Sequence, residues 1–148
     1  MRILFYADGR SPTTLNWMRY WIRSGDEVHL VSSFPCEAQP GLASLQVVPV
    51  AFSSTKTSTG SVGQKKSLLW GAGTLHLRLL VRQWLGPLTI PGAGRALKAA
   101  VERIQPDLVH ALRIPYEGMT AGAANLNAPL LISVWGNDFT LHARSSPW

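Results

Sequence analysis

The sequence predicts an open α/β fold, in which a doubly wound parallel sheet carries helices on both faces. The main observation is that short apolar runs of strand length alternate with longer segments of helical periodicity. The first run, residues 3–7, is nearly continuous in apolar residues, as expected of a strand buried on both faces of a parallel sheet. A helix and a second strand follow it within roughly 30 residues, the length of a parallel strand–helix–strand crossover.

The first elements have recognisable boundaries. The strand at residues 3–7 leads to Ser11, a preferred residue for capping the start of a helix, and to Pro12, which needs no N–H at the first helical position. Apolar residues at helical spacing then continue until Gly25, where a helix is expected to end. Residues 27–32 follow directly as the second strand.

The later elements are expected as a strand at 45–49, a mobile loop at 53–67, helices at 68–85 and 94–104, a strand at 107–111, a helix at 117–125 and a strand at 130–134. The loop has Val62 as its one apolar residue in fifteen, too few to offset the cost of ordering. In the second of these helices, Leu97 and Val101 share one face, and Pro106 ends the segment. Together the elements predict a Rossmann-like sheet.

Composition narrows the functional classes. The 148 residues and a hydrophobic content of 46% fit a single domain. The 14 Lys+Arg against 8 Asp+Glu give a net charge of +6, and a basic surface attracts phosphates on lipids or nucleotides. Cys36 is the only cysteine, which excludes an intrachain disulfide and fits a reducing compartment. No signal peptide or membrane span is apparent. We therefore expect a cytoplasmic protein, either free or peripheral on the inner face of the membrane.

Three segments follow predicted strands at the carboxyl edge of the sheet, where ligands bind in open α/β folds. They are residues 8–11, 112–118 and 135–139. In the first of them, Gly9 allows a close backbone approach, the helix start favours an anion, and Arg10 can donate to two oxygens at once. The same residues also serve folding alone in many strand-to-helix turns, so both interpretations stay open.

Several common site types are absent from the sequence. It has no Gly-x-Gly-x-x-Gly loop, no Walker A loop and no Gly-x-Ser-x-Gly elbow. His29, His76 and His142 lack partners at metal-ligand spacing, so we expect no metal. Aromatic residues are not interleaved with Lys or Arg in a nucleic-acid-binding pattern, and no nucleic-acid partner is expected.

Three segments of this chain together resemble the N-terminal domain of family-four glycosyltransferases, which have the GT-B fold. They are MRILFYADGRSPTTLNWMRYWIRSGDEVHLVSS, IQPDLVHALRIPYEG and APLLISVWGNDFTLHARSSP, in the order of that domain's first, fourth and fifth strands. The resemblance covers nearly the whole chain except residues 53–90. It implies the acceptor-binding half of a retaining sugar transferase, with the nucleotide-sugar bound mainly by a C-terminal domain that has no counterpart here. We expect the 148 residues to be inactive alone and to need no cofactor besides that co-substrate.

The resemblance also implies roles for single residues. Gly9, and with it Arg10, is expected to face the donor diphosphate, while Asp138 matches the acid of the family's Trp-Gly-x-Asp or His-Gly-x-Asp segment. Asp138 and His110 are the catalytic candidates. The acceptor-binding candidates are Ser11, Arg113, Tyr116, Glu117, Trp135 and Asn137.

Each of these roles has a structural alternative. Asp138 is equally suited to cap a helix at residues 139–144, and His110 to be a hydrogen-bonded histidine within a buried strand. Trp135, which stands where many members of the family have histidine, either stacks on a sugar or packs in the core. The sequence also departs from the family at Leu112, where the fourth strand often ends in a second histidine, so the general base is not assigned.

Two further hypotheses concern partners. The helix at 68–85 carries Trp70 and Trp84 among arginines and follows two lysines, a pattern that fits an anionic membrane surface contacted through residues 65–85. Packing against another part of a larger protein explains the same pattern. The rival function is a stand-alone α/β module that binds an anionic, phosphate-bearing ligand without catalysis. Otherwise the expected partners are a sugar or lipid-linked acceptor and a nucleotide-sugar donor.

Overall fold

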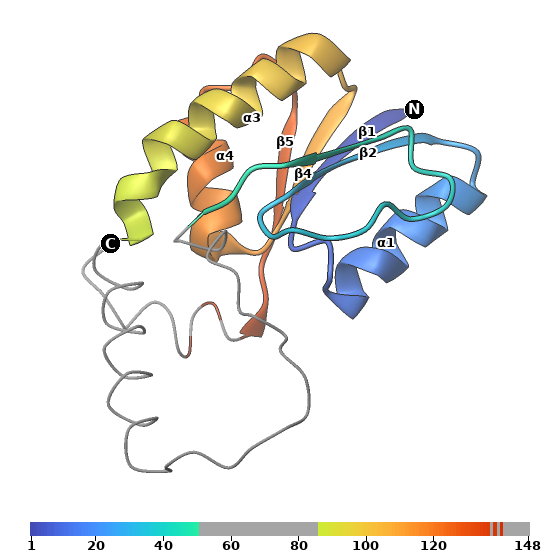
Figure 1. Cartoon of the computed structure of the whole chain (residues 1–148), viewed down its shortest axis with the longest axis horizontal. Coiled ribbons are helices and arrows are strands. Elements are labelled where there is room, and N and C mark those ends of the chain that lie inside the picture. Colours follow the sequence, from blue (N-terminus) through green and yellow to red (C-terminus); the bar gives the residue numbers. More distant parts are fainter. Residues whose placement is uncertain (51–85, 137, 139, 141–148) are drawn as a thin grey trace, which may run out of the picture.

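The computed structural model describes residues 1–50, 86–136, 138 and 140, and within them five strands form one sheet (Figure 1). The strands are β1 (Arg2–Ala7), β2 (Glu27–Ser32), β3 (Ser44–Val47), β4 (Leu108–Leu112) and β5 (Leu130–Ser133). Their order is β3-β2-β1-β4-β5, and every neighbouring pair is parallel. The predicted open parallel α/β sheet is therefore confirmed, with β1 central between β2 and β4.

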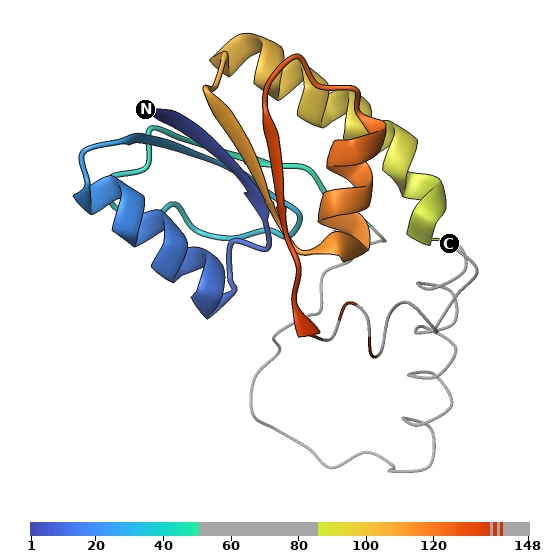
Figure 2. The same ribbon diagram turned by 180° about the vertical axis from the view of Figure 1, so that it is seen from behind.

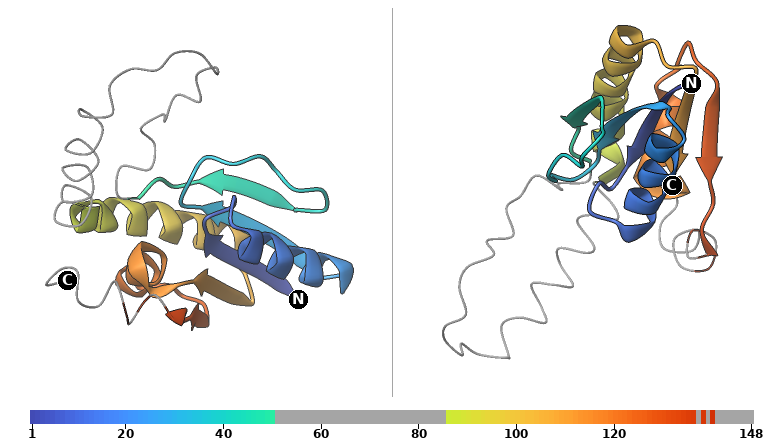
Figure 3. Two further views of the ribbon diagram at one scale, coloured as in Figure 1. Left: turned by 90° about the horizontal axis from the view of Figure 1, so that it is seen from below. Right: turned by 90° about the vertical axis from the view of Figure 1, so that its right-hand side faces the viewer.

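Helices cover both faces of this sheet. They are α1 (Pro12–Arg23), α3 (Ile90–Ile104) and α4 (Met119–Ala123), with two irregular turns, η1 (Gly86–Thr89) and η2 (Ile114–Gly118). The helix α1 lies on one face, and α3 and α4 lie together on the other (Figures 2 and 3). No helix in the described part of the chain has both the length and the apolar run needed to cross a membrane.

Alternate residues of β1 fill two separate cores. Phe5 packs on the α1 side with Met18, whereas Leu4 and Tyr6 pack on the other side with Leu97 of α3. All five side chains are completely buried. Because successive residues of a strand point to opposite faces, a strand covered on both faces must be apolar throughout, as the first run is.

The amino-terminal edge of the sheet is closed by ionic contacts. The Met1 amino group donates to Asp26 at 2.8 Å, and the Arg2 guanidinium donates to Glu27 at 2.9 Å. The backbone N–H of Arg2 donates to Asp107 Oδ2 at 2.7 Å. The strand β4 begins at Leu108, one residue later than predicted, and the Asp107 carboxylate instead binds the start of β1. The charged side chains at this edge are thus used in contacts within the protein. The candidate ligand-binding residues lie at the opposite, carboxyl edge.

Two helix boundaries differ from the predictions. The helix predicted at 94–104 begins four residues earlier, at Ile90. Ile90 and Gly94 are both buried, so this first turn is part of the packed face of the helix. A Cβ on Gly94 would lie 3.6 Å from Ala124, so this glycine lets α3 pack closely against the end of α4. The helix predicted at 117–125 is shorter, because its first two residues belong to the irregular turn η2. The predicted loop at 53–67 and helix at 68–85 lie outside the described residues.

Candidate functional site

The sheet has its topological switch point between β1 and β4. The chain adds β2 and β3 on one side of β1, then returns to add β4 and β5 on the other. The loops that follow β1 and β4 therefore leave adjacent strands toward opposite faces, which opens a crevice at the carboxyl edge. The candidate site is built from these two loops, residues 8–11 and 113–118, and from the loops after β2 and β5.

The loop after β1 is organised by an ion pair. The Arg10 guanidinium donates from Nε and Nη2 to the two carboxylate oxygens of Asp8, each at 3.0 Å, and lies 4.0 Å above the ring of Phe34. Partial burial of Asp8 opposes its ionisation, but the hydrogen bonds from Arg10 outweigh this and lower the pKa of Asp8. The fork of Arg10 thus faces the chain's own carboxylate rather than the crevice.

Gly9 makes its close approach to the protein itself. Its N–H donates to Ser32 Oγ at 3.0 Å, and a Cβ at this position would overlap Cys36 Sγ. The N–H groups of Arg10 and of Ser11 both donate to Asp8, at 3.0 Å. The backbone N–H groups of Gly9, Arg10 and Ser11 are therefore all engaged by the protein itself.

Ser11 occupies the predicted N-cap position but makes no side-chain cap bond. The first helical hydrogen bond runs from Leu15 N–H to Ser11 C=O, at 3.0 Å. The N–H groups of Thr13 and Thr14 consequently have no partner within the helix, as is usual for the first turn. They are the remaining backbone donors at this helix start.

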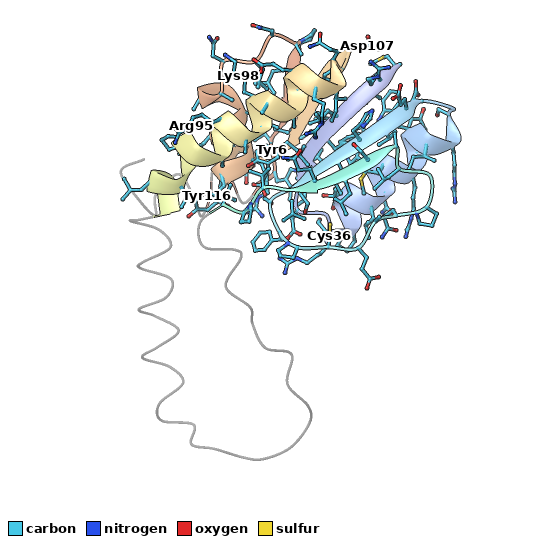
Figure 4. The ribbon with its side chains drawn as sticks, turned by 45° about the horizontal axis from the view of Figure 1, so that its top comes forward. Tyr6, Cys36, Arg95, Lys98, Asp107 and Tyr116 are labelled. Carbon is cyan, nitrogen blue, oxygen red and sulfur yellow. The ribbon has the colours of Figure 1, made fainter. Side chains whose placement is uncertain are left out.

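The loop after β4 has a strained backbone. Arg113 adopts φ 133° and ψ 156°, a region that is essentially restricted to glycine, and Tyr116 adopts φ 64° and ψ −60°, the conformation of a rare γ-turn. Gly118 closes the turn with an N–H bond of 2.9 Å to the Arg113 carbonyl. Such strain costs about 1–3 kcal/mol per residue and concentrates at functional sites. The ring of Tyr116 packs against the core beside α3 and α4 (Figure 4).

Glu117 lies in this strained loop and is buried, with 3% of its surface exposed. Its Oε1 accepts a hydrogen bond of 2.6 Å from the Ser33 hydroxyl, which links the loop after β4 to the loop after β2. Burial raises the pKa of Glu117, while the nearby guanidinium of Arg113 acts in the opposite direction and Asp8 reinforces the rise. The three loops therefore bring two carboxyl groups and one guanidinium into electrostatic contact. Sequence reasoning missed Ser33 and, although it named the segment 8–11, gave Asp8 no role; both residues directly follow strands that end at this edge.

Two buried hydroxyls lie beneath Glu117. Tyr6 on β1 and Thr120 on α4 are neighbours, and within the described part of the chain neither hydroxyl makes a well-aligned hydrogen bond. Burial is the main cause that raises the pKa of Tyr6, and the charge of Glu117 adds to it. A buried polar pair, Tyr6 and Thr120, therefore lies next to the strained loop that carries Glu117.

Asp138 joins the loops after β4 and β5. Its Oδ2 accepts the backbone N–H groups of Ile114 and Trp135, both at 3.0 Å. The alternative, a cap for residues 139–144, falls largely outside the described residues; the two donors that the structure gives to this oxygen both precede Asp138 in the chain. The residue is 4% exposed, and Oδ1 has no hydrogen-bond partner among the residues described. The Arg113 guanidinium lies 5.8 Å from the centre of the Trp135 ring, within cation–π range.

His110 is placed in the middle of β4, away from these loops. Its ring packs between Phe5 and Trp17, with centroids 5.3 Å away in each case, and its Nε2 is 2.8 Å from Ser133 Oγ. Burial lowers the pKa of His110, so the ring is neutral at physiological pH. These contacts fit the structural alternative, and the structure does not bring His110 together with Asp138 at the crevice.

The other residues considered in the sequence lie apart from the candidate site or outside the described part of the chain. His29 forms hydrogen bonds with Ser44 and Glu27 at the amino-terminal ends of β2 and β3, away from the candidate site. Its role is therefore structural. Asn137 lies outside the described residues. In the part of the chain that the structure covers, no three His, Cys, Asp or Glu side chains come together as a metal site.

Chemically, the crevice offers carboxyl oxygens that accept hydrogen bonds, a guanidinium that donates them, and one indole ring. Asp8, Arg113, Glu117 and Asp138 come from three loops and converge on the switch point. This combination suits a neutral ligand that has several hydroxyl groups. Comparison of the sequence with protein-family models and with curated proteins gives no match.

Proposed function

We propose that this chain is the acceptor-binding, Rossmann-like N-terminal domain of a retaining glycosyltransferase. In this proposal, a sugar passes from a nucleotide-sugar to a sugar or lipid-linked acceptor held at the carboxyl edge of the sheet. Two lines of argument support it: the three sequence segments that resemble family-four enzymes, and the open parallel sheet in which they occur in the expected order. The nucleotide-sugar is the co-substrate, and no further cofactor is proposed.

One observation carries the proposal. The loops that flank the switch point bring buried carboxyls and Arg113 together on a backbone strained at Arg113 and Tyr116. Strain of this kind persists only where the surrounding structure holds it, and a ligand site explains why it is kept. Hydroxyl groups both donate and accept, so a polyhydroxyl acceptor matches the mixed set of acceptors and donors.

The residues have distinct roles in this scheme. Oδ1 of Asp138, which has no hydrogen-bond partner among the described residues, accepts a hydrogen bond from an acceptor hydroxyl, and Arg113 and Trp135 bind the sugar that carries it. Gly9 and Arg10 shape the wall that faces the donor diphosphate. The chain contributes by fixing the acceptor in an attacking orientation, while charge stabilisation of the oxocarbenium-like transition state comes mainly from donor-side groups.

The rival function, a binding module for a phosphate-bearing ligand, rests on the free N–H groups of Thr13 and Thr14 and on the basic net charge. Two contacts weigh against it. The fork of Arg10 is engaged by Asp8, and the N–H of Gly9 is engaged by Ser32. Contact of residues 65–85 with a membrane stays a separate proposal, since those residues lie outside the described part.

The test combines ligand binding with turnover. Saturation-transfer NMR of the chain with glucose, galactose, mannose and N-acetylglucosamine should show saturable contact with at least one sugar, and Arg113→Ala should abolish it. Lys98→Ala, within α3 and outside the candidate site, is the control and should leave sugar binding unchanged. UDP-glucose and GDP-mannose should be neither transferred nor hydrolysed. Binding of inorganic phosphate without sugar binding would favour the rival, and turnover by this chain would refute the division of labour.

A further inference from the structure

The outer face of α1 carries aromatic side chains that are unusually exposed. Tyr20 is 62% and Trp17 is 40% exposed, although the opposite side of the helix is buried on the sheet. They border an open hollow of about 600 Å³ lined by Thr13, Asn16, Trp17, Tyr20 and Trp21. None of these lining residues is charged. Exposed aromatic side chains gathered on one face and rimmed by polar residues are a common mark of an interaction surface.

Two arginines lie beside the aromatic residues. Arg19 and Arg23 are exposed and one helical turn apart, and Arg23 is three residues from Tyr20, so these side chains share the outer half of the helix. The twelve residues of α1 include no Asp or Glu. Across the described residues, neither arginine takes part in an ion pair with a carboxylate. The face is therefore cationic as well as aromatic.

Trp17 contacts the sheet beneath α1. Its ring meets His110 edge-to-face with centroids 5.3 Å apart, and His110 is in turn bonded to Ser133 on β5. On the same side of the sheet, Leu131 of β5 is 48% exposed. An exposed apolar side chain of the outer strand thus lies on the same side of the sheet as α1.

We infer that the outer face of α1 docks on an anionic phospholipid bilayer. Trp and Tyr favour the membrane–water interface because each has an apolar body and a polar tip, and exposed arginines are attracted to anionic headgroups. Charge complementarity selects this occupant over a second copy of the chain. Two copies packed through this face would bring Arg19 and Arg23 of both copies to one interface with no acid on α1 to pair them. The inference does not depend on sugar transfer.

Co-sedimentation with vesicles tests it. The whole chain should bind phosphatidylglycerol–phosphatidylcholine vesicles, bind pure phosphatidylcholine much less, and be released by salt. Arg19→Glu/Arg23→Glu should weaken binding about tenfold or more. The matched control is Arg95→Glu/Lys98→Glu, which makes the same change in charge on α3, across the sheet (Figure 4). It should change binding by about twofold or less.

A second pair of variants tests the aromatic part without changing charge. Tyr20→Ala should weaken binding, and Trp17→Phe should remove a blue shift of tryptophan emission seen on adding anionic vesicles. Thermal unfolding of each variant confirms that it is folded. Absence of binding, or equal losses in the α1 and α3 charge reversals, would overturn the inference. So would a dimer, detected by light scattering without lipid, that Tyr20→Ala dissociates.

Discussion

Glu117 is the residue at which ionisation and folding of the candidate site are most directly linked. It is buried, and its pKa is raised in the folded chain, mainly by burial. The unfolded chain therefore loses the proton near the ordinary value of 4.5, while the folded chain still holds it. Because the folded state then binds more protons than the unfolded state, stability must fall as pH rises through this interval.

The first prediction follows from this sign. Between pH 4.5 and the raised pKa, Glu117 should lower the free energy of unfolding by at most about 1.4 kcal/mol per pH unit. Glu117→Gln keeps an oxygen for the Ser33 hydroxyl but cannot ionise, so its advantage over the parent chain should grow with pH. Urea unfolding of both proteins across this range measures the difference. A difference that does not change with pH would show that Glu117 ionises normally.

The second prediction concerns Gly9. Gly9→Ala should destabilise the fold by about 1–3 kcal/mol, because the new methyl group overlaps Cys36 Sγ and crowds Leu30 and Ser32. Gly92→Ala is the control, since an added Cβ there meets no atom within 4 Å and the residue lies in α3. It should be neutral or gain up to about 1 kcal/mol. If both variants unfold at the same urea concentration, the packing argument for Gly9 fails.

At the scale of elements, the loops after β4 and β5 are held together by one carboxylate. Removing Asp138 leaves the N–H groups of Ile114 and Trp135 without their shared acceptor. Asp138→Ala should therefore cost about 2–4 kcal/mol, whereas Asp138→Asn keeps an acceptor oxygen and should cost less than half of that. Urea unfolding compares the two variants. Equal losses would mean that the carboxylate charge, and not the hydrogen bonds, joins the loops.

The start of α1 gives a contrasting prediction. Ser11 has the extended backbone of an N-cap, yet its side chain makes no cap bond. Ser11→Ala should thus cost less than about 0.5 kcal/mol, although a working serine cap is typically worth about 1 kcal/mol. Thermal unfolding is precise enough to separate the two values. A loss of the full amount would show that the hydroxyl caps the helix in solution.

The central strands β1, β2 and β4 were predictable because burial on both faces leaves a signal in the sequence itself. Residues 27–32 match β2, and the first strand was missed only at Arg2, a polar residue at its start. The start of α3 was missed because Gly92 and Gly94 suggest a break, although Pro91 in its first turn is typical of a helix start and Gly94 allows close packing on α4. Local pattern cannot register contacts between segments far apart in the chain.

The candidate site was predictable in position but not in detail. Parallel strands place their following loops at one edge, which is enough to bring Arg113 and Glu117 near Asp8. The bond between Ser33 and Glu117 joins residues 84 positions apart, and no spacing rule indicates it. The hydrogen bonds from Arg10 to Asp8 could not be predicted either, because a guanidinium close to a carboxylate in sequence can bind that carboxylate or a ligand.

At the scale of the whole molecule, the two edges and the two faces of the sheet differ in chemistry. Ion pairs close the amino-terminal edge, whereas strained backbone and buried carboxyls mark the carboxyl edge. One face is covered by α3 and α4, and the other by α1, which presents aromatic and basic side chains outward. The two proposals therefore concern different parts of the domain: sugar binding is proposed at the carboxyl edge, and membrane contact on the outer face of α1.

The central claim is that the switch point between β1 and β4 binds a neutral sugar. Amide chemical-shift mapping with the sugar that gives the strongest saturation transfer tests it most directly. The account predicts that the largest shifts fall on residues 113–118, on Trp135 and on Asp8, and that Arg113→Ala removes them. It would be contradicted if sugars shifted none of these amides while inorganic phosphate shifted those of Thr13 and Thr14.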